Sequence, residues 1–192
     1  MPDPIAMAQT TVTADPNGDI AFVLGSSEDA THVQVNSQVL KLASPVLTAM
    51  FGPHFAEGQG LSSNSSKPVQ VPLPDDNPEA MVWILLALHY CEKPAFDIPL
   101  RLLLRIAVHC DKYDLTRALR GWGDSMLRLN EETSAEESEF TLILASAYSL
   151  NNHESFWRSS RWLLVSGTLA NLGNGRKIDD GDGRLPEGLI GL

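Results

Sequence analysis

The one cluster of side chains in this sequence with the chemistry to bind zinc consists of two histidines and two cysteines, His89, Cys91, His109 and Cys110. A tetrahedral zinc site needs four converging ligands, which usually come in pairs separated by roughly two to five residues. No Cys-Cys or His-His pair here has that spacing, and His109 and Cys110 would point about 100° apart on one helix. We therefore expect packed cysteines and hydrogen-bonded histidines, and we predict no metal site.

Motifs of catalysis and cofactor binding are also incomplete. The sequence has no Gly-x-Ser-x-Gly elbow or Walker loop, and Gly58 to Gly60 stops short of a dinucleotide fingerprint. Residues 180–183 resemble the start of a calcium loop, but Arg184 replaces a ligand and Gly191 stands where the bidentate glutamate belongs. We predict no catalytic residue and no cofactor, and an enzyme built from scattered His, Asp and Ser residues is kept as the alternative from another class.

Charge and composition restrict the classes of partner. The 192 residues carry a net charge of -10 and no cluster of Lys and Arg, which argues against direct binding of nucleic acid. The first ten residues lack the features of a secretory signal, and no apolar run approaches the roughly 20 residues that span a bilayer. Two cysteines fit a reducing compartment. We expect an intracellular protein, cytoplasmic or nuclear, that does not enter a membrane.

The first half of the chain predicts a small sheet with helices. Residues 1–17 have no period and are interpreted as a flexible leader, after which the alternation in 20–24 and 33–35 predicts a hairpin. The period then changes to helical, and Ser44 with Pro45 predicts the cap and first position of a second helix. A Gly/Ser-rich loop is expected up to Pro68. A third strand over 69–71 and a buried helix starting after Asn77 should follow.

The second half predicts helices alone. Apolar residues recur at helical spacing over 98–113, 115–129, 134–150 and from Asn152 to about residue 167. An acidic stretch from Glu131 to Glu139 is interpreted as a solvated junction with a capping box from Ser134 to Glu137, and the tail 168–192 as disordered. We expect the three tryptophans of this half to lie in the core, and Phe156, Trp157, Leu163 and Leu164 to form the buried side of the last helix.

Several local motifs, taken in order, resemble the BTB/POZ family. They are Gly18-Asp19-Ile20-Ala21-Phe22-Val23, Val35-Asn36-Ser37-Gln38-Val39-Leu40, Ser44-Pro45-Val46-Leu47, Asp76-Asn77-Pro78-Glu79-Ala80 and Cys110-Asp111-Lys112-Tyr113. The resemblance covers residues 18–129, which implies an α+β BTB/POZ fold with a small mixed sheet capped by helices. Residues 130–167 would form a C-terminal helical extension. The divergent helices after residue 130 resemble fungal members of the family.

The resemblance also implies protein partners and the surfaces that bind them. The helix containing Val39, Leu40 and Ala43 matches the centre of the family homodimer, although simple core packing competes as an interpretation. Phe55 and Glu57 resemble the element with which ligase-adaptor members touch a cullin scaffold. Asn36 and Ser37 replace a histidine and a basic residue found in many animal members, so Asp19 has no positive partner and corepressor binding there is not expected.

These observations predict a protein interaction module that forms homo- or hetero-oligomers. The alternatives are a substrate adaptor of a cullin-type ubiquitin ligase and a transcriptional regulator. Because the chain is acidic, a transcriptional regulator of this kind would need a partner protein that binds the DNA.

Overall fold

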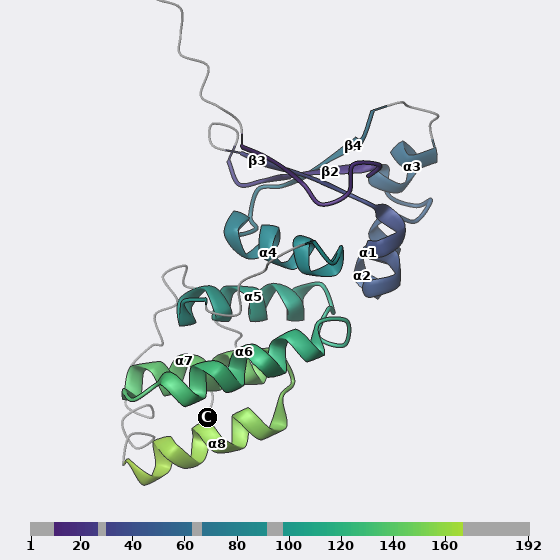
Figure 1. Cartoon of the computed structure of the whole chain (residues 1–192). Coiled ribbons are helices and arrows are strands. Elements are labelled where there is room, and N and C mark those ends of the chain that lie inside the picture. The colour runs from purple at the N-terminus through teal and green to yellow at the C-terminus, as the bar shows by residue number, and fades with distance from the viewer. Residues whose placement is uncertain (1–9, 27–29, 63–66, 92–97, 167–192) are drawn as a thin grey trace, which may run out of the picture. The chain divides into compact units, whose positions relative to one another are not determined.

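The computed structural model describes residues 10–26, 30–62, 67–91 and 98–166, which form a mixed α+β structure with a four-stranded sheet and eight helices (Figure 1). The chain divides into two compact units, residues 1–94 and 95–192. The boundary predicted between residues 129 and 130 lies inside a helix of the second unit, which continues to Thr133. The predicted tail 168–192 lies outside the described residues.

The sheet of the first unit has the strand order β1-β3-β2-β4. Its central pair, β2 (Ile20–Leu24) and β3 (Thr31–Val35), is antiparallel, with Phe22 opposite Val33. The outer strands are parallel to their neighbours: β1 (Thr10–Thr13) to β3 and β4 (Val69–Leu73) to β2. The mixed sheet and the hairpin are confirmed. Alternate residues of β2 are buried, as a strand with one covered face requires.

The prediction of a flexible leader was wrong for residues 10–17. Thr10–Thr13 forms β1, Ala14 is buried, and the backbone N–H of Ala14 donates to the carbonyl of Gln34 at 2.9 Å. The Thr-Thr-Val-Thr sequence is β-branched throughout and therefore favours a strand. It shows no alternation because this edge strand is exposed on nearly all its residues, so a search for periodicity missed it.

Four helices complete the first unit: α1 (Ser37–Ala43), α2 (Pro45–Met50), α3 (Ala56–Ser62) and α4 (Pro78–Leu88). Helix α4 lies against one face of the sheet, and α1 to α3 gather at one end of it (Figure 1). The cap at Ser44 and the buried helix after Asn77 are confirmed. Residues 56–62 were expected in a loop and are helical instead.

Glycine in α3 reflects close packing and not a flexible loop. A Cβ atom added to Gly58 would lie 1.9 Å from the carbonyl oxygen of Gly52, so the backbone can make this approach only with glycine. The glycine-rich composition of this segment therefore misled the prediction.

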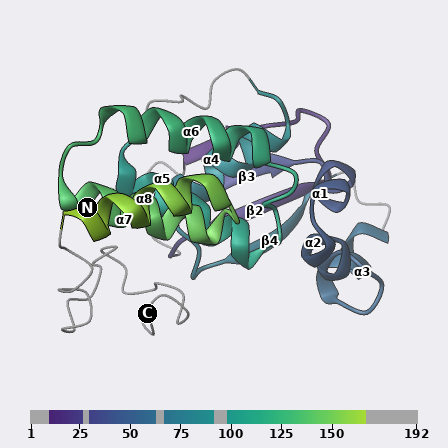
Figure 2. The same ribbon diagram turned by 90° about the horizontal axis from the view of Figure 1, so that it is seen from below.

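The second unit contains α5 (Leu100–Lys112), α6 (Arg120–Thr133), α7 (Glu137–Ser149) and α8 (His153–Val165). Helix α7 lies between α5 and α8 and buries most of its residues (Figures 1 and 2). In the described ranges no helix is long and apolar enough to cross a bilayer.

Two details of this unit differ from the prediction. Helix α7 is capped at Glu136, whose backbone N–H donates to the Glu139 carboxylate at 3.0 Å, and not by Ser134 with Glu137. On α8, Phe156 and Trp162 are half-buried and Leu163 is fully buried, but Trp157 and Leu164 are exposed. Apolar residues surround this helix, so periodicity alone could not assign its buried side.

Candidate interaction surfaces

The three residues predicted for a homodimer interface differ in their burial. Leu40 has no accessible surface within its own chain and belongs to the core, whereas Val39 and Ala43 are half-buried. Leu40 therefore cannot contribute contact area to a partner while the unit is folded. Of the three, only Val39 and Ala43 remain available for contact.

Leu42 is the residue of this region that sequence reasoning missed. Its side chain is 90% exposed, and Val46 at the start of α2 is also exposed. Leu42 lies two positions after Leu40, which places it on the opposite side of α1 from the core. The sequence did contain a signal for this exposed site, because Leu42 falls outside the 3.6-residue repeat of the other apolar residues of the helix. We call Leu42 and Val46, with Val39 and Ala43, the α1–α2 face.

Hydrogen bonds fix the angle between α1 and α2. The Ser44 hydroxyl accepts the backbone N–H of Leu47 at 2.9 Å, which caps α2. The Thr48 hydroxyl oxygen lies 2.8 Å from the carbonyl oxygens of both Lys41 and Ser44, which share its one proton. Leu42 and Val46 are thus carried by a defined corner of the backbone, and a partner would meet a preformed surface.

Phe55 and Glu57 lie at the start of α3. Phe55 is 52% exposed, and Glu57 is half-buried in the first turn of the helix, where a negative charge is favourable. The neighbouring aromatic side chain, Phe51, is buried and packs against Phe22 with ring centroids 6.2 Å apart. The core thus uses Phe51 and leaves the Phe55 ring accessible to a partner.

Asp19, the acidic residue of the first motif, finds hydrogen-bond donors for its carboxylate within the chain. Its carboxylate accepts the backbone N–H of Ser37 at 2.7 Å and the Ser37 hydroxyl at 2.6 Å. The serine that binds this carboxylate is itself buried. The arrangement ties the start of β2 to the first turn of α1.

His89 provides a second tie to α1. Its Nδ1 lies 2.8 Å from the Leu85 carbonyl oxygen, and its Nε2 lies 3.0 Å from the backbone nitrogen of Asn36. A carbonyl oxygen only accepts and a backbone N–H only donates, so Nδ1 carries the proton and Nε2 accepts. The neutral imidazole thus joins the end of α4 to the cap of α1.

Polar groups around this tie are also paired. The Asn36 side-chain amide donates to Asp15 at 3.0 Å, and the backbone N–H of Asn17 donates to the same carboxyl group at 2.8 Å. These two bonds hold the pKa of Asp15 below its ordinary value. The Cys91 thiol donates to the Ala14 carbonyl at 3.1 Å. In this arrangement histidine and cysteine serve as structural hydrogen-bonding groups.

In the second unit the side chains considered for zinc are again occupied by packing. His109 Nδ1 lies 2.8 Å from the Arg105 carbonyl oxygen, and burial raises the pKa of the Cys110 thiol to about 12. His109 is buried. Among the described residues, no group of three or more His, Cys, Asp or Glu side chains is placed to hold a metal ion.

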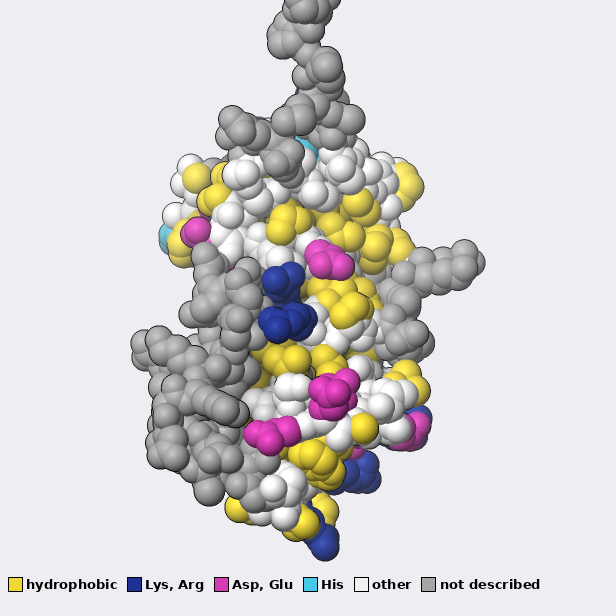
Figure 3. Space-filling view, turned by 90° about the vertical axis from the view of Figure 1, so that its left-hand side faces the viewer, with side chains coloured by type: hydrophobic (Ala, Val, Ile, Leu, Met, Phe, Trp, Pro, Cys, Tyr) yellow, Lys and Arg dark blue, Asp and Glu magenta, His cyan; other side chains and the backbone are white. Residues whose placement is uncertain are grey.

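The outer side of α8 is the second apolar surface. Trp157 is 59% exposed, Leu164 64% and Val165 81%, and the Arg161 guanidinium lies 5.4 Å from the centre of the Trp157 ring. At the lower end of Figure 3, where α8 lies, hydrophobic side chains alternate with charged ones. We call Glu154, Trp157, Arg161, Leu164 and Val165 the α8 face.

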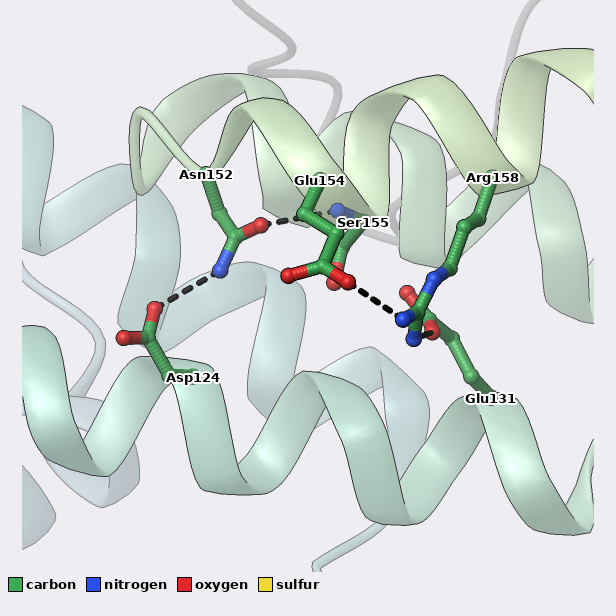
Figure 4. A network of polar contacts seen from close by, with 6 residues as sticks. All are labelled: Asp124, Glu131, Asn152, Glu154, Ser155 and Arg158. Atoms are coloured by element: carbon green, nitrogen blue, oxygen red, sulfur yellow. Dashed lines mark hydrogen bonds and ion pairs between the residues drawn. The ribbon is translucent and has the colours of Figure 1, made fainter.

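Polar contacts hold α8 on the remainder of the unit (Figure 4). Asn152 caps α8 through Ser155 and donates to Asp124 of α6 at 2.7 Å. Arg158 binds Glu131 of α6 at 3.2 Å and also Glu154 on its own helix. On the inner side, the Phe140 and Trp162 rings stack with centroids 4.2 Å apart. The α8 face is therefore presented by an anchored helix.

Comparison with models of known protein families finds no match to this sequence, and comparison with curated proteins finds none.

Proposed function

We propose that this chain is a protein interaction module of the BTB/POZ type, which forms homo- or hetero-oligomers and needs no cofactor. The observation that carries the proposal is the exposure of Leu42 beside a buried Leu40 on the same short helix. A fully exposed leucine on a rigid backbone gains most of its transfer free energy only when a second surface covers it.

The order of elements supports the BTB/POZ assignment. The Val35–Leu40 motif spans the end of β3 and the start of α1, Ser44 with Pro45 opens α2, and Asn77 with Pro78 opens α4. Each of these motifs falls at the boundary of an element, in the same order as in the family. The α1–α2 face is then the part of the chain that we assign to association.

Sedimentation velocity of the full chain at tens of micromolar tests this surface. Replacement of Leu42 by Asp should lower the fraction of associated chains, because a charge would have to be desolvated in the contact. Gln70→Asp is the control, since it places the same charge on an exposed site of β4, outside the α1–α2 face. Equal association in wild type and both variants would contradict the use of this face.

A cullin-type ubiquitin ligase scaffold is the second candidate partner, favoured by the exposed Phe55 ring next to Glu57. In this hypothesis the ring fills an apolar pocket of the scaffold, and the carboxylate meets a basic residue at its rim. Copurification of a cullin should therefore fall about thirtyfold or more in Phe55→Ala, as for an aromatic hot spot. His54→Ala, at the neighbouring exposed position, is the control. Unchanged recovery with Phe55→Ala would reject this contact.

A further inference from the structure

Helix α8 has an inverted distribution of side chains. Its buried residues are Ser155, Ser159 and Leu163, while Trp157, Leu164 and Val165 face outward. The Ser159 hydroxyl is buried without a hydrogen-bond partner among the described residues. Burial of Ser159 while Trp157 stays exposed opposes the transfer free energies of both side chains. The outer side of α8 therefore has the composition of an interface and not of a solvated surface.

Charges on this side restrict what can cover it. Along the exposed stripe the order is acid, aromatic and base, with Glu154 one turn before Trp157 and Arg161 one turn after it. A partner surface of one sign would meet a like charge at one end of the stripe. A surface with the same charges in reverse order would match both ends. The antiparallel copy of α8 itself has that order.

The geometry points to a second copy of this chain as the occupant: we propose that two α8 faces pair antiparallel around a two-fold axis near Trp157. Glu154 and Arg161 are equally far from the position between Trp157 and Arg158. Each Glu154 would therefore meet the Arg161 of the other copy, and the two Trp157 rings would pack near the axis. Such a contact is isologous, because both copies use the same residues.

The ends of the helix also fit this register. Leu164 and Val165 would extend beyond the start of the other α8, toward the exposed Tyr148 at the end of α7. Arg158 lies near the proposed axis, where Glu131 binds it and offsets its charge. Glu154 also binds Arg158, so in the pairing its carboxylate is shared between this arginine and the Arg161 of the other copy. The pairing thus uses most of the exposed apolar residues of α7 and α8. It lies outside the α1–α2 face, so it goes beyond the proposed function and can fail independently of it.

A charge exchange in the full chain tests the register. Glu154→Arg alone and Arg161→Glu alone would each place like charges together twice, and the dimer dissociation constant should rise at least about tenfold. The double variant Glu154→Arg with Arg161→Glu restores opposite charges and should recover the association of the wild type. Arg128→Glu on α6 is the control for a change of charge elsewhere in the unit. Circular dichroism of every variant checks that the helices are retained.

Sedimentation velocity of these proteins at tens of micromolar gives the outcome. Trp157→Asp should raise the dissociation constant by about thirtyfold or more, as expected for a central aromatic residue. Recovery in the double variant, together with loss in each single one, would support the pairing. A monomeric wild type would overturn it. A dimer whose dissociation constant is unchanged by every α8 substitution would also overturn it. This includes a dimer that dissociates only when Leu42→Asp is introduced.

Discussion

Helices α1 and α8 expose leucine for different structural reasons. Helix α1 follows the ordinary rule, because Leu40 is buried against the sheet unit and Leu42, two positions later, must face outward. Helix α8 departs from that rule, because it buries Ser159 and exposes Trp157. The first case is one apolar residue added to an otherwise regular helix, and the second is a side of a helix with three large apolar residues exposed. The exposure of an apolar side chain is thus a better indicator of a contact surface when it is compared with the side chains that the same helix buries.

The largest expected effect is on stability, and it should differ between substitutions of the two leucines of α1, Leu40 and Leu42. Leu40→Ala should lower the free energy of unfolding by about 2–5 kcal/mol, since it removes a fully buried side chain and leaves a cavity. Leu42→Ala should change it by no more than about 0.5 kcal/mol, as for other exposed sites. Urea denaturation of both variants measures the difference. Similar losses in the two would show that Leu42 belongs to the core.

A smaller effect is expected where α4 joins α1. His89→Ala removes the acceptor of the Asn36 N–H and should cost about 1–3 kcal/mol, because a half-buried donor is left unpaired. Nitrogen-15 NMR of the imidazole should show the proton on Nδ1 in the wild type. The control is His32→Ala on β3, which changes a histidine elsewhere in the unit. A proton on Nε2, or equal stability of His89→Ala and wild type, would contradict the proposed link.

The smallest effect concerns the start of α7. Backbone N–H groups of Glu136 and Ala135 bind the Glu139 carboxylate and lower its pKa. A lowered pKa in the folded state stabilises the protein above the ordinary pKa of a glutamate, and this stabilisation is lost as the pH falls through the lowered value. The melting temperature should therefore fall with acidification, and less steeply in Glu139→Gln. Glu132→Gln is the control, and identical slopes would contradict this assignment.

The sequence alone predicted the elements that local chemistry determines. Alternation identified β2 and β3, and side-chain caps with a following proline located α2 and α4. Strand β1 and helix α3 were missed, because an exposed edge strand has no alternation and glycine in a close contact resembles glycine in a loop. Strand β1 depends on its pairing with β3, and α3 on the close approach of Gly58 to Gly52; composition reports neither contact.

The surfaces were harder to predict than the elements. Phe55 could be identified as an accessible aromatic residue, whereas Leu40 was assigned to an interface although it is part of the core. Trp157 and Leu164 of the α8 face were assigned to the buried side, because apolar residues surround this helix. Which side of such a helix is buried depends on its packing against α6 and α7, including the contacts of Asn152 and Arg158.

The most direct test of the central claim, that exposed apolar helix surfaces of this chain bind other polypeptides, is the sedimentation of four proteins side by side. These are the wild type, Leu42→Asp, Trp157→Asp and the variant that combines Leu42→Asp with Trp157→Asp, here called the double variant, all at tens of micromolar. The account predicts that the wild type associates, that each single variant retains one kind of contact, and that the double variant is monomeric. A wild type that sediments as a strict monomer and binds no polypeptide through either surface would contradict it.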